Sequence, residues 1–357
     1  MFGSRKTSST PSKYSLQGLR QVYSELLTSH AEARAAKATG RPPPVGRKES
    51  LIETIRAISE IIIYGEQNSE QELIFDYFCE KNMLALLTDM MKAPWSDDAV
   101  QCQIIQTVAI LVQNVQNETS LYYLLSNNYI NEIISFDRIS LVNEDLASQF
   151  VSFLKTLSMR LNDQTVQFFL DDRLASFPLY DCVIRFISGS PDAMARTSAL
   201  TIILNLFRVQ DKGLRAFLLR PDKQRVFFRQ LGQLLQDHTG RLLEAVLQAH
   251  EQSALRCGGG LAWPPPTVTN EELAARARMD ELVANLQDQL LYLQDVLDLG
   301  IPALAERMGD YFVSSFVRPT LLEPLAAWHA GVRKQSERKR RASPWPPPPQ
   351  CQQQQQQ

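Results

Sequence analysis

The sequence lacks any long hydrophobic run. Among its 357 residues there is no stretch of about 18 or more consecutive apolar residues, the length that a membrane-spanning helix needs. Its first residues, MFGSRKTSSTPSKYS, carry charges but no apolar segment behind them, which argues against a secretory signal peptide. We therefore expect a cytoplasmic protein.

Cysteine and histidine are scarce and scattered. The five cysteines show no CxxC spacing and the four histidines show no HExxH spacing, which argues against a disulfide framework and a zinc site. Glycine-rich phosphate-binding motifs and the GxSxG motif are missing as well. The sequence thus predicts no catalytic residue, no metal and no cofactor, and we expect no enzyme activity and no small-molecule substrate.

Charge is nearly balanced overall but uneven along the chain. The net charge is −2, whereas residues 1–48 carry +7 and residues 333–341 carry +5, which leaves an acidic body of −14. Basic ends can contact anionic lipid or nucleic acid, but they are more often solvated tails. We expect no nucleic-acid partner.

Almost everything between the low-complexity segments is predicted to be helical. Residues 50–63 and 143–161 show apolar residues at i, i+3, i+4 and i+7, and Asn143 stands at a capping position. The expected organisation is a disordered start at 1–13, a helical repeat domain at 14–256 with a Pro-rich loop near 40–48, a Gly/Pro-rich linker or loop at 257–268, further helices at 269–330, and a basic, then Pro/Gln-rich disordered tail at 331–357.

An internal repeat sharpens the prediction of fold class. A set of three apolar residues recurs twice at an offset of 46 residues, as Val108, Leu111 and Val115, then Leu154, Leu157 and Leu161, then Leu200, Ile203 and Phe207. A helix pair repeated at that interval belongs to the HEAT/armadillo length class, in which each unit buries its apolar face by stacking on its neighbours. We therefore expect an all-α, HEAT/armadillo-like solenoid.

Several strings in chain order carry a resemblance. LIETIRAISEIIIYGEQN, FDYFCEKNMLALL, ETSLYYLLSNNYINEII, FVSFLKTLSMRLNDQTVQFF and FPLYDCVIRF resemble the FPL domain of the endosomal-maturation-defective family, also called C-type lectin domain family sixteen member A. The name-giving tripeptide would be Phe177, Pro178 and Leu179. A later string at 279–325 resembles the next part of the same family, so the resemblance covers roughly residues 14–325.

The resemblance implies a function as well as a fold. It implies a cytosolic helical scaffold, peripheral on endosomal and lysosomal membranes, that acts in endosome-to-lysosome traffic, autophagy and mitophagy. Partners would be tethering, retromer or ubiquitin-ligase proteins. The alternative is a subunit or regulator of a ubiquitin-ligase complex. A lectin activity has no support, because no disulfide framework or calcium-binding loop is visible.

Candidate partner-binding residues lie in two segments. The Asn127–Asn128 turn either only connects two helices or forms, with the FPLY segment, one edge that binds a partner; Asn tolerates left-handed backbone and caps helices. The candidates are Tyr122, Tyr123, Asn127, Asn128, Phe177, Pro178, Leu179 and Tyr180. For membrane attachment we favour a protein partner over the basic N-terminal region, which has no apolar face to insert.

The end of the chain departs from the family pattern. After Leu325 the family would continue with further helices, whereas this sequence becomes basic and then rich in proline and glutamine. We expect either a natural short form or an artefact of the gene model.

Overall fold

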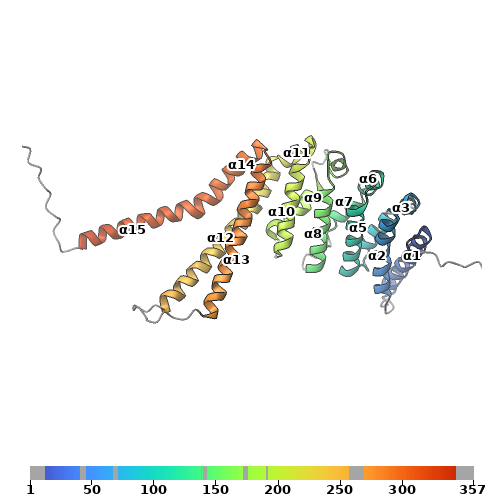
Figure 1. Cartoon of the computed structure of the whole chain (residues 1–357), viewed down its shortest axis with the longest axis horizontal. Helices are drawn as coiled ribbons and strands as arrows, with labels where there is room; N and C mark the ends of the chain where they lie inside the picture. Colours follow the sequence, from blue (N-terminus) through green and yellow to red (C-terminus); the bar gives the residue numbers. More distant parts are fainter. Residues whose placement is uncertain are drawn as a thin grey trace, which may run out of the picture. The chain divides into compact units, whose positions relative to one another are not determined.

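The computed structural model describes residues 13–342 except 41–45, 67–70, 138, 140–142, 172–175, 190–191 and 257–268 (Figure 1). All regular elements in these ranges are helices, so the chain is all-α as predicted. The β-branched run at 61–63 lies inside a helix. The strand-like geometry described is confined to an isolated antiparallel bridge between Asp171 and Ser176.

The first eleven helices and one short 3-10 turn precede two long helices. Their bounds are α1 Leu16–Thr39, α2 Arg47–Glu66, α3 Gln71–Glu80, α4 Met83–Lys92, α5 Asp98–Asn114, α6 Glu118–Ser126, α7 Tyr129–Ile134, α8 Glu144–Met159, η1 Thr165–Phe168, α9 Pro178–Gly189, α10 Ala193–Arg208 and α11 Lys212–Leu218. The later elements are α12 Pro221–Arg256, α13 Asn270–Asp298, α14 Pro302–Phe312, η2 Val313–Leu322 and α15 Glu323–Ala342.

Short polar side chains start many of these helices. Asn143 caps α8 as predicted, because its side chain accepts a hydrogen bond from the Leu146 backbone N–H at 3.1 Å. Asp97 caps α5 in the same way. At the start of α13, Thr269 and Glu272 each accept a bond from the other's backbone N–H, which is a capping box. These caps fix where each helix enters the stack.

The Pro-rich loop between α1 and α2 is bounded by two glycines. Gly40 and Gly46 have φ of 65° and 79°, a left-handed conformation that glycine adopts without strain. The loop predicted near 40–48 ends when α2 begins at Arg47, and residues 41–45 lie outside the described part.

Four long helices pack in series through their apolar faces. α2 packs against α5, α5 against α8 and α8 against α10, and Figure 1 shows these ribbons as a row. All nine residues of the predicted repeat are buried, including Leu154 and Leu157. The 46-residue offset therefore places equivalent apolar residues in the interfaces between successive helices.

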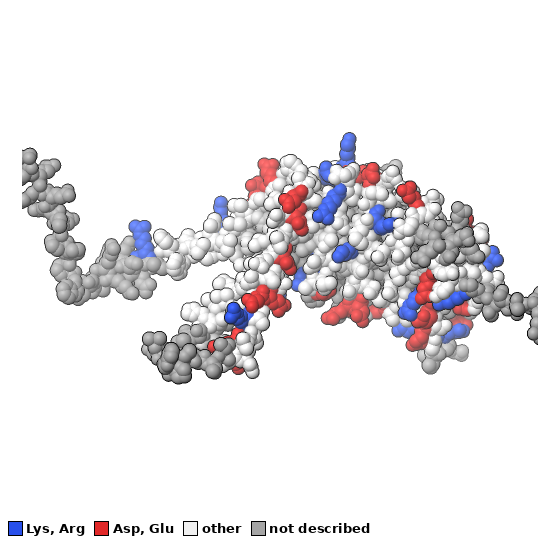
Figure 2. All heavy atoms as spheres, viewed as in Figure 1, with Lys and Arg blue, Asp and Glu red and all other residues white. Residues whose placement is uncertain are grey.

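Charged side chains cover the surface of these helices and form ion pairs across it. Figure 2 shows Asp and Glu groups over the visible face with Lys and Arg among them. Lys13 pairs with Glu60 at 3.0 Å and Lys223 with Asp181 at 2.5 Å. Exposed pairs of this kind each contribute about 0–1 kcal/mol, so apolar packing is the larger stabilising force.

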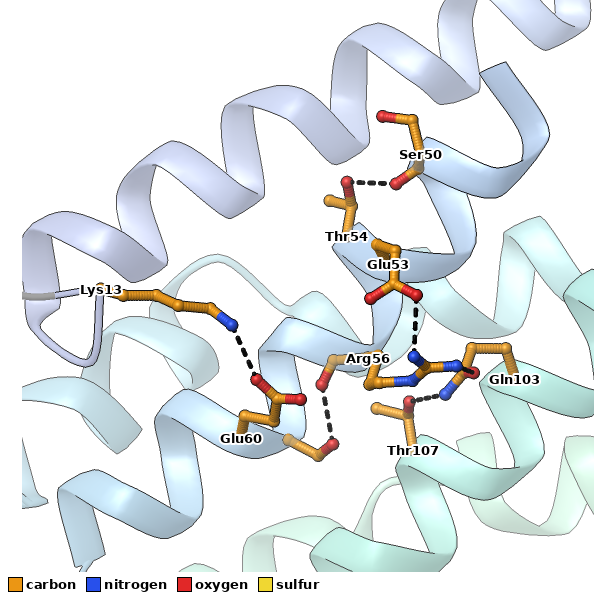
Figure 3. A network of polar contacts seen from close by, with 9 residues as sticks. Lys13, Ser50, Glu53, Thr54, Arg56, Glu60, Gln103 and Thr107 are labelled. Carbon is orange, nitrogen blue, oxygen red and sulfur yellow. Dashed lines mark hydrogen bonds and ion pairs between the residues drawn. The ribbon is translucent and has the colours of Figure 1, made fainter. Parts of the chain in front are cut away.

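Polar contacts between helices repeat at nearly the same interval as the apolar ones. Between α2 and α5, the Arg56 guanidinium donates to Gln103 Oε1 at 3.3 Å (Figure 3). Within α5, Gln103 Nε2 donates to Thr107 Oγ1 at 3.3 Å. Asn143 Nδ2 donates to Asp98 Oδ2 at 2.9 Å, and Asn205 Nδ2 to Ser158 Oγ at 3.0 Å. The three bonds between helices join residues 45 to 47 positions apart and fix the register of neighbouring helices.

The chain divides into two compact units, which differs from the predicted boundaries at 256 and 268. Unit 1 comprises residues 1–234 and 290–300, and unit 2 comprises 235–289 and 301–357. Within unit 1, the end of α13 covers α10, where the Tyr292 hydroxyl donates to the Leu200 carbonyl at 3.0 Å. Because α12 and α13 each contribute to both units, the Gly/Pro-rich segment at 257–268 is not the boundary.

Unit 2 contains a π-helical stretch and a helix that the sequence analysis did not predict. The π-helix η2 holds Pro319, which has no N–H to donate and does not fit a regular α-helical turn. α15 extends to Ala342, so the prediction of a disordered tail is wrong for residues 331–342. The physical reason is that this stretch holds good helix formers and no proline before Pro344.

None of the helices within the described ranges is both long enough and apolar enough to cross a lipid bilayer.

Leu157→Ala tests the packing of α8 between its neighbours. Because Leu157 is fully buried, the truncation should lower the free energy of unfolding by about 2–5 kcal/mol. Leu73→Ala, at a side chain 60% exposed on α3, is the matched control and should change it by less than about 0.5 kcal/mol. Urea unfolding of the two variants measures the difference; equal effects would contradict the packing described.

Candidate functional site

A polar groove opens in unit 1 where three elements meet. It lies beside α7, the turn η1 and the start of α9, and has a volume of about 570 Å³. Its walls are formed by Asn128, Asn131, Glu132, Ser135, Phe168, Phe169, Leu170, Asp171, Ser176 and Pro178. The groove therefore brings together the Asn127–Asn128 turn and the FPLY segment, the two segments proposed from the sequence.

Side-chain and backbone hydrogen bonds hold the groove open. Asn131 Nδ2 donates to the Phe168 carbonyl at 3.1 Å and to Asn128 Oδ1 at 3.3 Å. Across the groove, Asp171 and Ser176 exchange two backbone hydrogen bonds of 3.0 and 3.1 Å. Asn131 Oδ1 is buried and has no hydrogen-bond partner within the described residues.

The groove has an acidic character. Among the described residues of its walls, two are carboxylates, Glu132 and Asp171, and none is basic. Glu132 is paired with Lys92 of α4, and both side chains are about one-third exposed. Asp171 is exposed. A ligand that offers hydrogen-bond donors or positive charge would complement these groups.

Both predicted tyrosines lie on α6, outside the groove lining. The Tyr122 hydroxyl bonds to Gln164 Oε1, and its ring meets Phe168 edge-on at 6.0 Å. The Tyr123 hydroxyl donates to the Cys79 carbonyl at 3.2 Å, and burial raises the pKa of Tyr123. Both side chains are half-buried and support neighbouring turns.

The two asparagines of the turn have different roles. The half-buried Asn127 ends α6 and donates from Nδ2 to the Tyr123 carbonyl at 2.8 Å, whereas Asn128 is exposed and lines the groove. Their φ angles are −75° and −62°, so neither adopts the left-handed backbone that asparagine tolerates. In the described chain the non-glycine residue with that conformation is Asn82, with φ of 47°.

Only Pro178 of the FPLY segment reaches the groove. Phe177, Leu179 and Tyr180 are buried, which corrects the expectation that they lie on a partner-binding edge. The Tyr180 hydroxyl donates to the Lys223 carbonyl at 2.8 Å, and burial raises its pKa. The rings of Phe177 and Tyr180 pack against Phe217 where the segment enters α9. Three of the four side chains of the segment are therefore part of the core.

The sequence analysis missed the residues that define the groove walls. Asn131 stands three positions after Asn128, so on one helix turn the two amides face each other. That spacing is visible in the sequence, whereas the bond to Phe168 joins residues 37 positions apart and depends on the packing.

A second cavity lies at the other end of unit 1. It measures about 410 Å³ and lies among α1, the start of α2 and the turn before α5. Arg47 pairs with Glu32 and Lys48 with Asp97 at its rim, each at 2.5 Å. Trp95 Nε1 and Ser96 Oγ are buried there without a partner in the described chain.

The cysteine thiols in the described part of the chain are not activated for reaction. Burial raises the pKa of the Cys79 thiol to about 12, and it raises the pKa values of Cys102 and Cys182 as well. These thiols are protonated at neutral pH and poor nucleophiles. No cluster of three potential metal ligands occurs among the described residues.

Asn131→Ala tests the groove wall. Loss of the bond to the Phe168 carbonyl should lower the free energy of unfolding by about 1 kcal/mol. Asn128→Ala, at an exposed side chain, should change it by less than about 0.5 kcal/mol. Chemical unfolding with both variants checks this, and an unchanged stability of Asn131→Ala would show that the bond does not brace the groove.

Comparisons with known proteins agree with the resemblance. The family model FPL, described as an uncharacterised conserved protein, matches residues 55–207, which include the whole groove. No solved structure matches the chain.

Curated relatives match most of this chain. Protein CLEC16A of Homo sapiens is 34% identical over 270 residues, 75% of this chain and 23% of the relative. The CLEC16A homolog of Caenorhabditis elegans is 33% identical over 279 residues, 78% of this chain and 28% of the relative. Protein TRANSPARENT TESTA 9 of Arabidopsis thaliana is 28% identical over 283 residues, 78% of this chain and 31% of the relative. The chain spans less than a third of the length of these relatives, and it belongs to the CLEC16A family.

Proposed function

We propose that this chain is a non-catalytic adaptor in endosome-to-lysosome trafficking, autophagy and mitophagy that acts by binding other proteins. The observation that carries the proposal is the acidic groove, which joins two family segments at a junction of helices within the FPL region. The groove offers hydrogen-bonding and charged groups to a partner, while its aromatic supports are packed away. This arrangement suits recognition rather than chemistry.

We further propose that the serial helices form a HEAT/armadillo-like α-solenoid. Support comes from the 46-residue apolar repeat and from hydrogen bonds at offsets of 45 to 47 residues. In such a fold each unit contacts only its neighbours, and turns along one edge present an extended binding surface. The α6–α7 turn and the entry to α9 would lie on one such edge.

The partner would present donors or basic residues to the groove. The carboxylates of Glu132 and Asp171 line the groove, so a Lys or Arg side chain of a partner would meet complementary negative charge there. Tethering, retromer and ubiquitin-ligase proteins are the candidate partners that the family resemblance implies. Membrane association would be peripheral, on endosomes and lysosomes.

The alternative proposal is a subunit or regulator of a ubiquitin-ligase complex. Transfer of ubiquitin through a thioester requires a reactive thiolate, whereas the pKa values of Cys79, Cys102 and Cys182 are all raised. This favours a role in assembling a ligase over a catalytic one. Cys257 and Cys351 lie outside the described residues.

Charge reversal in the groove tests the adaptor proposal. Asp171→Lys combined with Asn128→Lys should weaken binding of purified tethering or retromer proteins by at least about tenfold. The two new lysines would repel the basic side chains that the partner presents to the groove. Asp163→Lys is the matched control, since Asp163 is exposed nearby but does not line the groove. Biolayer interferometry measures the affinities, and circular dichroism checks the fold. Equal affinities for the wild type and the groove variant would exclude this groove as the binding site.

An autoubiquitination assay separates the two proposals. The purified chain with E1, E2 and ubiquitin should form no conjugates, and a Cys79→Ser variant should behave identically. Conjugates that depend on one of the cysteines would contradict the non-catalytic proposal.

A further inference from the structure

The end of unit 2 exposes an apolar stripe. Leu321 and Leu322 at the end of η2 are 44% and 54% exposed, and Leu325 and Trp328 of α15 are 61% and 68% exposed. By contrast, the buried residues of the preceding helix, Leu304, Met308, Phe312 and Phe316, stop at Phe316. The apolar pattern therefore continues past the point where the described chain can cover it.

The exposed residues share one face. Leu325 and Trp328 follow Leu321 at i+4 and i+7, and Val332 comes next in the sequence at i+11. This spacing is that of a single apolar stripe on an amphipathic helix. Trp and Leu on such a stripe are the residues that enter the boundary between lipid headgroups and acyl chains.

Positive charge follows the stripe directly on the same helix. Residues 333–341 hold six basic residues and one acidic residue, within α15. In Figure 2 the described part of α15, located by comparison with Figure 1, is white between blue groups on the visible side. An apolar half followed by a basic half is complementary to an anionic membrane surface, where basic residues meet phosphates and apolar residues insert.

We propose that α15, with the end of η2, is a membrane-binding helix for anionic phospholipid surfaces. Leu321, Leu325 and Trp328 enter the interface, and the basic half of the helix supplies the attraction to negatively charged headgroups. The inference rests on the peripheral membrane association of the proposed function, and it is independent of the acidic groove.

The other basic region of the chain lacks these features. In the N-terminal 48 residues, Lys13, Arg47 and Lys48 are paired with Glu60, Glu32 and Asp97. The buried residues of α1 are Leu19 and Leu26, so its apolar side chains serve the core. Ion pairs lower the effective charge that this region offers to a membrane, and among its described residues, 13–40 and 46–48, no exposed stripe is comparable to that of α15.

Vesicle co-sedimentation with the full chain tests the proposal. Vesicles of phosphatidylcholine with about 30% phosphatidylserine should bind the wild type, and pure phosphatidylcholine should bind it at least about tenfold less. Leu325→Glu combined with Trp328→Glu should weaken binding by at least about tenfold, because charged groups resist insertion. Replacing Arg338, Lys339, Arg340 and Arg341 by Gln should do the same through loss of charge.

The control places the same kind of change elsewhere. Met194→Glu alters an apolar side chain that is 75% exposed at the start of α10, and it should leave vesicle binding unchanged. Circular dichroism and the groove-binding assay identify any variant that misfolds. A second readout, quenching of tryptophan fluorescence by brominated lipid, should fall clearly in Trp328→Phe if this side chain inserts.

Three results would overturn the proposal. These are no binding of the wild type to anionic vesicles, unchanged binding of the Leu325→Glu, Trp328→Glu variant, or quenching that does not depend on Trp328. Light scattering tests whether the stripe instead joins two copies of the chain. In that case the wild type is a dimer, the Leu325→Glu, Trp328→Glu variant is a monomer, and neither binds vesicles. Failure of vesicle binding with intact groove binding would reject this inference alone.

Discussion

The structure depends on the burial of one helix face against the next. α5 and α8 each carry apolar residues that no single helix could hide, and each is covered by the helix that follows about 46 residues later. A fully buried leucine is stabilised by about 1.5–3 kcal/mol relative to an exposed one. Summed over the buried residues, this force is large compared with the exposed ion pairs. Apolar packing between neighbouring helices is therefore the main stabilising interaction in unit 1, and its other features depend on it.

Serial packing also explains why polar groups gather at the turns. Where two helices meet along their length, buried polar atoms such as those of Gln103 and Thr107 must find partners in the adjacent helix. Where the chain reverses direction, the helix ends leave carbonyls such as that of Phe168 for side chains to satisfy. Asn131 does this at the groove. The polar groove is thus a product of the same packing that builds the core.

Local chemistry and periodicity were the parts of the structure that could be predicted. The cap at Asn143 depends on three consecutive residues, and the burial of Leu154 and Leu157 follows from the 3.6-residue period and the repeat. Both predictions are confirmed. The burial of Phe177, Leu179 and Tyr180 could not be read locally, because it depends on Phe217 and Lys223, roughly 40 residues further along.

One further miss has a separate cause. The helical state of residues 331–342 was missed because a run of charges was interpreted by composition alone, whereas alternating good helix formers continue the helix that begins at Glu323.

The groove and the C-terminal stripe obey different physics. At the groove, binding would depend on Glu132, whose side chain is only about one-third exposed and whose charge is therefore less screened by salt than a fully solvated one. On α15, attraction to headgroups acts between solvated charges and weakens with ionic strength, while the contribution of Leu325 and Trp328 persists because apolar burial is not screened. Because the groove and α15 would respond differently to salt, the chain could release a partner protein or a membrane while it keeps the other bound. An adaptor that must bring a protein partner to a membrane needs both.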